Sequence, residues 1–364
     1  MVDMQTIERL AQEYNVPIED ALFISLNVNG VDFACDYNRM RMAFRLSNDT
    51  RFAYATQRKE REYYFALPIT PSSSFSIRED GLLRLHDTVI GEAIGPTEDI
   101  CDSHYPRRNG TSININPNSR TSCRGCDFCY TAYQVPYDKQ RLETARDIHD
   151  FFDDWLEAEN KQDLSHLLQV SVVTGCYPTS EELCDFLETL KDVLNEYAFQ
   201  GRIFYLGSQL NTFEHLERLE RLRPFGICYS LETFGRRELL KNTKRMLTLD
   251  RVVQLMDAAR ELEFEVNFSY IVGMEPLHVM EYHFRNLMQH INKFPTINTL
   301  QLHKYHKGTI MDPDAKHLAY FLEARKILEQ IFAYTPMRPL VWEDYRSLWF
   351  LTFNGEPLHG IRTP

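Results

Sequence analysis

The chain has 364 residues, of which 43% are hydrophobic and 25% are charged, and its formal net charge is −12. These values suit a barrel-sized domain with appendages, and the 15 glycines and 16 prolines are too few for long disorder. The acidic balance argues against nucleic acid as a partner, because duplex-binding proteins usually present a basic face. A small molecule or a peptide is the more plausible substrate class.

The cysteines and the apolar pattern predict a reducing, aqueous compartment. Eight cysteines are unevenly spaced along a long chain, which favours metal ligation over a disulfide framework. The first residues lack the apolar core of a signal peptide. No apolar run approaches 18 residues, so no membrane span is expected. We therefore expect a cytoplasmic protein without a membrane partner.

Residues 1–105 predict a small β-rich domain. Asn29-Gly30 is a hairpin signal and Asp80-Gly81 a turn signal. The expected elements are a helix over 4–13, then strands over 23–33 (folded back at the hairpin), 63–69 and 76–85.

Residues 106–310 alternate between strand and helix patterns. The expected strands cover 112–116, 169–173, 202–206, 226–231, 265–272 and 299–303. The expected helices cover 138–158, 180–197, 213–222, 248–262 and 278–292, and Ser180 and Thr248 are their clearest N-caps. This alternation is typical of an α/β fold with parallel strands and right-handed crossovers. A closed eight-stranded barrel needs about 250 residues, so the pattern predicts a partial (β/α)6 TIM-like barrel.

Residues 311–364 predict a C-terminal extension. Its expected elements are a helix over 315–332 and strands over 339–342 and 347–353.

Three cysteines, Cys123, Cys126 and Cys129, lie within seven residues directly after the first strand of this barrel. Catalytic groups of such folds lie at the carboxyl ends of the strands. Clustered thiolates are typical ligands of iron–sulfur clusters, which usually take four, so three would leave one iron open. A zinc site is the alternative, although structural zinc requires a fourth ligand. A non-catalytic protein stabilised by zinc or by an iron–sulfur centre is a further alternative.

The stretch from Ile113 to His303 resembles the radical S-adenosylmethionine (SAM) superfamily. The usual signature of that family is C-x3-C-x2-C with an aromatic residue before the last cysteine. Cys126-Asp-Phe-Cys129 reproduces its second half, whereas Cys123-Arg-Gly-Cys126 is one residue short. The resemblance implies that the three cysteines hold one 4Fe–4S cluster and that SAM binds the open iron.

The resemblance also implies positions at which SAM would be bound, all at strand ends. These are Gly175, Cys176 and Tyr177 after the second strand, Ser230 and Glu232 on the fourth, Gly273 on the fifth and His303 on the sixth. For Glu232 the alternative is a surface salt bridge, and for His303 a structural or substrate-facing role. Cys176 could instead be a fourth cluster ligand. Lys244-Arg245, in the next loop, could pair with the SAM carboxylate or be solvated.

The activity implied by the resemblance is reductive cleavage of SAM to a 5′-deoxyadenosyl radical, which abstracts hydrogen from a substrate. A small molecule or natural-product intermediate is expected, and a peptide is the alternative. A flavodoxin-type or ferredoxin-type reductant is the expected electron donor.

Overall fold

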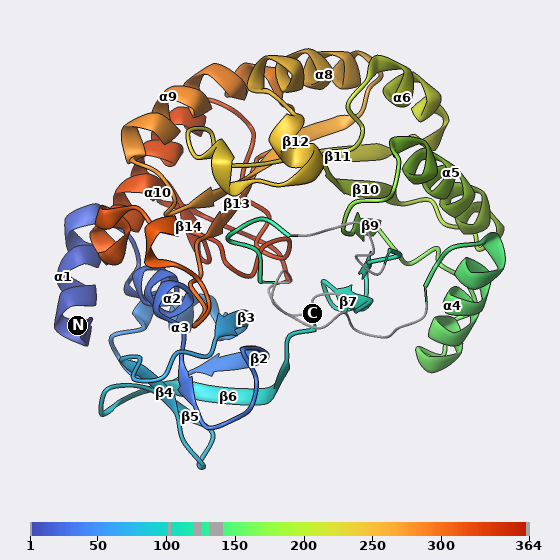
Figure 1. The fold of residues 1–364 in the computed structure, drawn as a ribbon. Coiled ribbons are helices and arrows are strands. Elements are labelled where there is room, and N and C mark those ends of the chain that lie inside the picture. The colour runs from blue at the N-terminus through green and yellow to red at the C-terminus, as the bar shows by residue number, and fades with distance from the viewer. Residues whose placement is uncertain (1, 101–102, 119–124, 131–140, 362–364) are drawn as a thin grey trace. The chain divides into compact units, whose positions relative to one another are not determined.

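The computed structural model describes residues 2–100, 103–118, 125–130 and 141–361, and Figure 1 shows its ribbon. The chain divides into two compact units. The first unit comprises Met1–Asp99, Tyr270–Asn286 and Thr296–Pro364, and the second comprises Ile100–Ser269 and Leu287–Pro295. Each unit is described by itself. Within the described ranges, none of the helices combines the length and the apolar character that a bilayer span requires.

The first unit contains a six-stranded sheet with the order β1-β4-β5-β6-β2-β3. The pairs are antiparallel except for β1 with β4. The strands are β1 (Asp32–Phe33), β2 (Arg39–Leu46), β3 (Glu62–Pro68), β4 (Phe75–Ile77), β5 (Leu82–Leu85) and β6 (Thr88–Glu98). The helices that lie wholly in this unit are α1 (Met4–Tyr14), α2 (Ile18–Asn29), α3 (Ala53–Arg58) and α10 (Leu318–Phe332).

The hairpin predicted at Asn29-Gly30 is wrong, because α2 occupies this region. Nearly all of α2 is buried, so its apolar residues do not follow one helical face and mimic the alternation of a strand. Phe23 on α2 packs against the rings of Phe44, Tyr63 and Phe65 on β2 and β3. Gly30, with φ of 66°, terminates the helix instead of turning a hairpin.

The strands predicted over 339–342 and 347–353 are also largely absent from the described structure. Only Thr352–Phe353 (β14) pairs, with Glu356–Pro357 (β15). The carboxylate of Asp20 accepts the backbone N–H groups of Phe350, Leu351 and Thr352 at 2.8 to 3.2 Å. These donors therefore need no neighbouring strand. Asp20 is fully buried and also pairs with Arg325 at 3.0 Å.

The second sheet has the order β13-β12-β11-β10-β9-β8-β7. The pairs β8/β9, β9/β10 and β10/β11 are parallel, and β7 adds an antiparallel edge strand that the sequence pattern did not predict. The strands are β7 (Tyr105–Arg107), β8 (Ser112–Ile115), β9 (Gln169–Val173), β10 (Arg202–Gly207), β11 (Phe225–Glu232), β12 (Glu265–Val272) and β13 (Thr296–Thr299). The partial barrel of six strands, β8 to β13, is thereby confirmed.

Helices follow the strands in the second unit, and Figure 1 shows α4, α5, α6 and α8 along the outer side of β9, β10 and β11. The bounds are α4 (Ala145–Ala158), α5 (Ser180–Glu196), α6 (Phe213–Arg218), α7 (Asn242–Met246) and α8 (Leu249–Glu261). The next helix in the chain, α9 (Leu277–Leu287), belongs to the first unit except for its last residue. All eight residues of β11 are buried, as expected for a parallel strand covered on both faces.

Three local predictions need correction. The N-cap of α5 is Thr179, whose hydroxyl accepts the N–H of Glu182, and Ser180 is the first helical residue. The helix predicted from residue 138 begins at Ala145, since Thr144 forms a capping box there. The sixth strand covers Thr296–Thr299 and not 299–303. Beyond its end, the side chain of Gln301 donates to the carbonyl of Ala66 at 2.8 Å.

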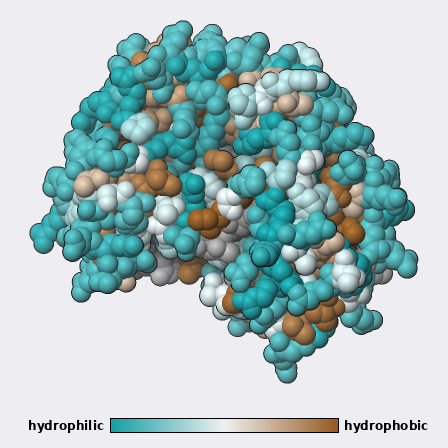
Figure 2. Space-filling model, turned by 180° about the vertical axis from the view of Figure 1, so that it is seen from behind, coloured by the Kyte–Doolittle hydropathy of each residue, from teal (hydrophilic) through white to brown (hydrophobic). Residues whose placement is uncertain are grey.

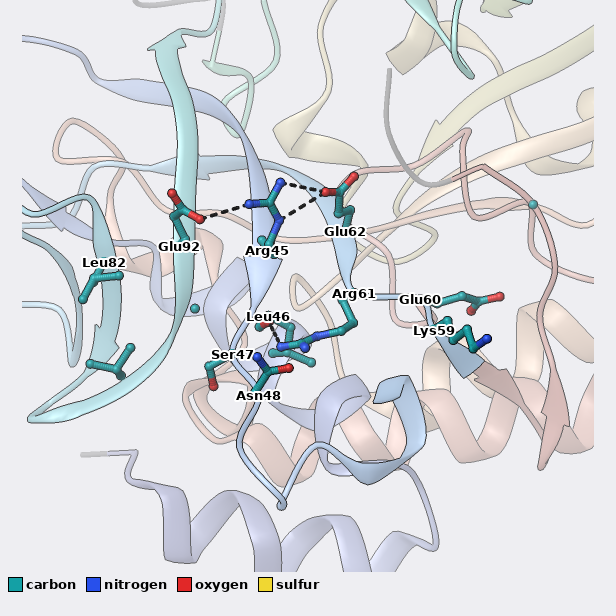
Figure 3. Close-up of a pocket in the computed structure, with 13 residues that line it drawn as sticks. Arg45, Leu46, Ser47, Asn48, Lys59, Glu60, Arg61, Glu62, Leu82 and Glu92 are labelled. Atoms are coloured by element: carbon teal, nitrogen blue, oxygen red, sulfur yellow. Dashed lines mark hydrogen bonds and ion pairs between the residues drawn. The ribbon is translucent and has the colours of Figure 1, made fainter. Parts of the chain in front are cut away.

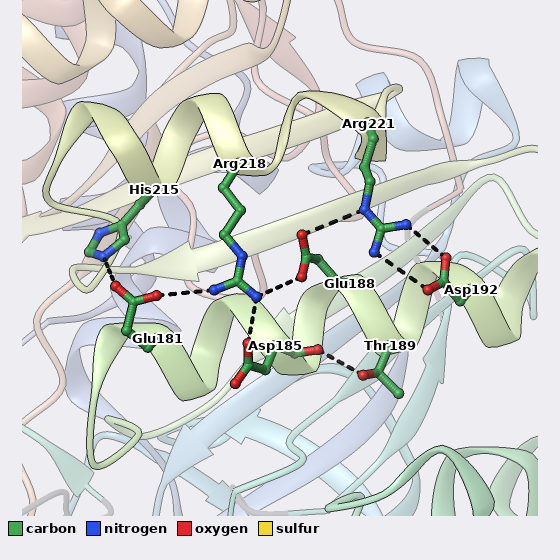
Figure 4. Close-up of polar contacts among 8 residues, drawn as sticks. All are labelled: Glu181, Asp185, Glu188, Thr189, Asp192, His215, Arg218 and Arg221. Carbon is green, nitrogen blue, oxygen red and sulfur yellow. Dashed lines mark hydrogen bonds and ion pairs between the residues drawn. The ribbon is translucent and has the colours of Figure 1, made fainter.

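A row of charged side chains joins α5 to α6 and to the turn that follows it (Figure 4). Arg218 reaches Glu181 at 3.0 Å and Glu188 at 2.6 Å, and Arg221 reaches Asp192 at 2.9 Å. The acidic residues recur at helical spacing along one face of α5, so a single face bonds both arginines. The face shown in Figure 2 is mostly hydrophilic, with small separate hydrophobic patches.

We expect Asp20→Asn to lower the free energy of unfolding by about 3 to 5 kcal/mol, because it leaves Arg325 and the tail N–H groups short of a buried acceptor. Urea unfolding followed by circular dichroism measures the change. Glu13→Gln, which breaks an exposed ion pair with Arg9, should leave stability nearly unchanged. Equal stability of Asp20→Asn and the native protein would contradict this role.

Candidate functional site

The site predicted from the sequence lies at the carboxyl ends of β8 to β11 in the second unit. Parallel pairing places these ends at the same edge of the sheet. The segment that follows β11, residues 233–247, contains α7 and contacts the loops after the other strands. Its contacts define the geometry described below.

Two of the three predicted cluster ligands are described, and Cys123 lies outside the described residues. Cys126 is 7% exposed, and Cys129 is half-buried. The backbone N–H of Lys241 points at the Sγ of Cys126 at 3.4 Å. The side chain of Lys241 pairs with Asp127 at 3.0 Å. The loop that carries Cys126 and Cys129 (the cysteine loop) therefore contacts the residue that precedes α7.

A partly buried ion pair lies beside these thiols. The Nζ of Lys244 is 2.6 Å from Oε1 of Glu232 at the end of β11. Glu232 is 7% exposed and its φ is 65°, a left-handed conformation that non-glycine residues rarely adopt away from constrained sites. The ion pair predicted as the alternative for Glu232 is thus present, but it is partly buried, with the side chains of Lys244 and Glu232 25% and 9% exposed.

Neighbouring charges and burial shift the pKa values of Cys126 and Lys244. Burial raises the pKa of the Cys126 thiol to about 11, although Lys244 acts in the opposite direction. Burial would lower the pKa of Lys244, but the charges of Glu232, Cys126 and Cys129 outweigh burial and raise it. Lys244 is therefore a permanent cation next to the cysteines at physiological pH.

Backbone contacts hold α7 at the strand ends. The guanidinium group of Arg237 donates to the carbonyls of Leu231 at 3.1 Å and of Leu247 at 2.6 Å, and also to that of Lys244. One side chain thus connects the end of β11 with Lys244 and with the C-terminal end of α7.

Thr243, next to Lys244, connects α7 with two further strand ends. Its hydroxyl is 2.6 Å from the hydroxyl of Ser208, which follows β10, and 3.6 Å from the Sγ of Cys176, which follows β9. Ser208 is buried and Cys176 is half-buried.

Side chains from two other loops form hydrogen bonds with the backbone of the loop Thr174–Pro178. Asn118, after β8, donates to the carbonyl of Cys176 at 2.7 Å. The side-chain amide of Gln209 accepts the N–H of Tyr177 at 2.7 Å and donates to its carbonyl at 3.0 Å. Gly175 lies half-buried in this loop. The backbone at the end of β9 is therefore held in one conformation.

Ser230 lies on β11, two residues before Glu232, and is 1% exposed. Its hydroxyl has no hydrogen-bond partner within the described part of the chain, and the same holds for the hydroxyl of Tyr177. Buried polar groups normally bond a protein atom, a water or a ligand. These two hydroxyls are thus available to a bound group.

The structure therefore brings together Cys126, Cys129, Cys176 and Glu232 through α7, with Gly175, Tyr177 and Ser230 in the adjoining elements. Sequence reasoning missed Ser208, Gln209 and Thr243. A signal existed for the first two, because they are polar residues directly after a buried strand.

Gly273 and His303, the other two predicted residues, belong to the first unit. Gly273 has φ of 119°, and a Cβ there would approach the Cβ of Leu300 to 3.0 Å. His303 is 7% exposed and its ring stacks on Tyr305. Burial, with contributions from Arg39 and His306, lowers the pKa of His303 to about 3, so its imidazole is neutral at pH 7.

The first unit also contains a pocket of about 630 Å³ bordered by β2, β3, β5 and β6 (Figure 3). Arg45 bonds Glu62 and Glu92 across it at 3.0 and 3.3 Å, and Arg61 bonds the carbonyl of Leu46. None of the site residues predicted from the sequence lines this pocket.

The groups around Cys126 in the second unit suit a negatively charged metal centre that is held by thiolates. Cys126 has an N–H donor on its sulfur and a lysine ammonium group nearby, which are the groups that stabilise a negatively charged metal–thiolate site. The described residues contain no group of three His, Cys, Asp or Glu side chains arranged for a metal. Cys123 is the third ligand in the predicted set.

Comparison with known proteins finds that residues 121–283 match the radical SAM superfamily. No curated protein matches the sequence. Similar solved structures include SuiB of Streptococcus suis bound to SAM, with 14% identity, a TM-score of 0.42 and coverage of 64% of this chain and 53% of that chain. Coproporphyrinogen III oxidase (HemN) of Escherichia coli, a radical SAM enzyme, has 17% identity, a TM-score of 0.41 and coverage of 57% and 50%.

A third similar structure is the radical SAM methyltransferase TsrM of Kitasatospora setae, with cobalamin and a 4Fe–4S cluster bound. It has 15% identity, a TM-score of 0.37 and coverage of 51% of this chain and 36% of that chain. The chain thus spans about half the length of SuiB and HemN, and less of TsrM.

The depressed pKa of His303 should make stability depend on pH. The unfolded side chain titrates near 6.5 and the folded one near 3, so the unfolded state binds the extra proton between these values and stability falls as pH drops below about 6.5. His303→Gln should reduce the slope by up to about 1.4 kcal/mol per pH unit. Unfolding in urea at pH 7, 6 and 5 measures this slope.

The exposed His359 provides the control for this experiment. His359→Gln should leave the slope unchanged. Because burial also lowers the pKa of His306, part of the slope should persist in His303→Gln. Identical slopes for the native protein and His303→Gln would disprove the assignment.

Proposed function

Because residues 121–283 match the radical SAM superfamily, we propose that this protein is an enzyme that cleaves SAM reductively and removes a hydrogen atom from a small-molecule substrate. The cofactors of this superfamily are a 4Fe–4S cluster and SAM. The observation that carries the proposal is the position of the cysteine loop against α7, at the carboxyl ends of the parallel strands.

Cys123, Cys126 and Cys129 would hold the cluster. The residues around the described pair fit such a group, since Lys241 already directs an N–H at the sulfur of Cys126 and Lys244 places a cation beside both thiols. Thiolate ligation with an N–H donor on sulfur is usual for protein-bound clusters. The spacing Cys123-x2-Cys126 is compatible with ligation from one short loop.

Seven residues would bind SAM, all of them at or just after strand ends. They are Gly175, Cys176, Tyr177, Ser230, Glu232, Gly273 and His303. The clamped loop of Thr174–Pro178 supports a backbone contact there, since Asn118 and Gln209 hold its peptide groups in place. The unbonded hydroxyl of Ser230 supports a polar contact from β11. Cys176 would lie beside SAM, because a fourth thiolate would block the open iron.

When bound, the cluster and SAM supply one-electron cleavage of the sulfonium to methionine and a 5′-deoxyadenosyl radical, and this radical abstracts hydrogen. The residues of the chain orient and enclose these groups. Arg237 and Thr243 keep α7 over the strand ends, and Lys244 offsets the negative charge of the thiolates. Such positioning is what a protein contributes to radical chemistry.

A small metabolite or natural-product intermediate is the proposed substrate, and an external flavodoxin-type or ferredoxin-type protein is the proposed reductant. No cysteine follows Cys228, so the C-terminal part of this chain offers no ligands for a second cluster. A peptide substrate is the second candidate suggested by the sequence.

We expect Cys126→Ala to abolish both iron binding and SAM cleavage. The native protein, reconstituted anaerobically with iron and sulfide, should bind about four irons per chain. On reduction it should convert SAM to methionine and 5′-deoxyadenosine, measured by chromatography.

The matched control is Cys184→Ala, which removes a buried cysteine on α5 without touching the cysteine loop. This variant should keep both properties. Full iron content in Cys126→Ala would refute the ligand assignment. A native protein that retains zinc and leaves SAM intact would refute the proposed function.

A further inference from the structure

We propose that Lys244 sets the reduction potential of the cluster by stabilising the reduced form through charge, and that Glu232 opposes this effect. The inference rests on the proposed function, because it requires a cluster on the cysteine loop. Lys244 is a positioning residue in this role, since its charge acts through space and its side chain need not bond the cluster or the substrate.

The first observation is the geometry of the segment Lys241–Lys244. The N–H of Lys241 points at the Sγ of Cys126, and Lys244 follows three residues later across the start of α7. Lys241 is the N-cap residue of α7, so the sulfur of Cys126 lies at the amino end of the helix whose first turn carries Lys244. The charge of Lys244 acts on both Cys126 and Cys129.

The second observation is the sign and strength of the local field. At the thiol of Cys126, the stabilising effect of Lys244 exceeds the destabilising effect of Glu232. The side chains of Lys244 and Glu232 are 25% and 9% exposed, so water screens their charges only partly. The ion pair thus leaves a net positive influence at the sulfur ligand.

The third observation is that Lys244 is held in place independently of its ion pair. Arg237 donates to the backbone carbonyls of Lys244 and Leu247. The hydroxyl of Thr243 is bonded to Ser208. A substitution of the Lys244 side chain should therefore change the charge near the cysteines while the backbone of α7 stays in position.

These observations have one electrostatic consequence. A cluster that accepts one electron gains one negative charge, and a nearby cation stabilises the reduced state more than the oxidised state. Lys244 should therefore raise the midpoint potential, and Glu232 should lower it. Charge-neutralising variants at the two positions should shift the potential in opposite directions.

The experiment is a redox titration of the reconstituted protein with dithionite, without SAM, in which electron paramagnetic resonance measures the reduced cluster. Lys244→Met should change the reduction equilibrium at least tenfold toward the oxidised form, which is about −59 mV for one electron. Glu232→Gln should shift the potential upward. Lys244→Arg keeps the charge, so its reduction equilibrium constant should stay within threefold of the native value.

Arg245→Gln is the matched control, because Arg245 is exposed on the same helix and its loss changes the net charge equally. Its reduction equilibrium constant should stay within threefold of the native value. An equal shift in Arg245→Gln and Lys244→Met would overturn the inference, and so would an unshifted Lys244→Met.

Should either single variant fail to bind iron, the double variant Lys244→Met/Glu232→Gln removes both charges without leaving one of them buried and unpaired. Its potential should fall below the native one, because Lys244 has the larger effect at Cys126. An unchanged or higher potential would contradict the inference. Failure of the proposed function is separate, because it would appear as a native protein that binds no 4Fe–4S cluster.

Discussion

The ion pair between Lys244 and Glu232 is the contact on which the geometry of the candidate site depends. A carboxylate that is almost fully buried requires a cation or several donors, and α7 brings that cation across the end of β11. Lys241, which precedes this short helix, places its N–H at Cys126, and Thr243 within the helix places a hydroxyl between Ser208 and Cys176. Loops from several strands are thereby assembled around one buried charge.

A buried carboxylate has a comparable part in the first unit. Asp20 collects backbone donors from the C-terminal tail and pairs with Arg325, whose guanidinium group also donates to the carbonyl of Thr352. In both units a charged side chain supplies hydrogen bonds where regular pairing between strands stops. This arrangement allows irregular backbone to be buried, because its polar groups remain bonded.

The regular elements of the barrel could be predicted because their signals are local. The bounds of β9 and β12 agree with the sequence prediction to the residue, since both stretches alternate between polar and apolar residues and are rich in β-branched and aromatic side chains. The errors fall where distant side chains decide the conformation. The hairpin predicted at Asn29-Gly30 is wrong because α2 is buried on nearly all sides, so its apolar residues do not repeat at a helical period. The strand predicted over 347–353 is largely absent because Asp20 accepts the N–H groups of Phe350, Leu351 and Thr352.

The sequence by itself determined the α/β alternation and the cysteine triplet after the first barrel strand. These depend on spacing within short stretches of the chain. Only the tertiary structure decided which side chains surround the cysteines. The contact of Lys241 with Cys126 joins residues 115 positions apart, and that of Ser208 with Thr243 joins residues 35 apart. Such pairs are set by the parallel alignment of strand ends and by the need to neutralise buried charge, which no local pattern of residues records.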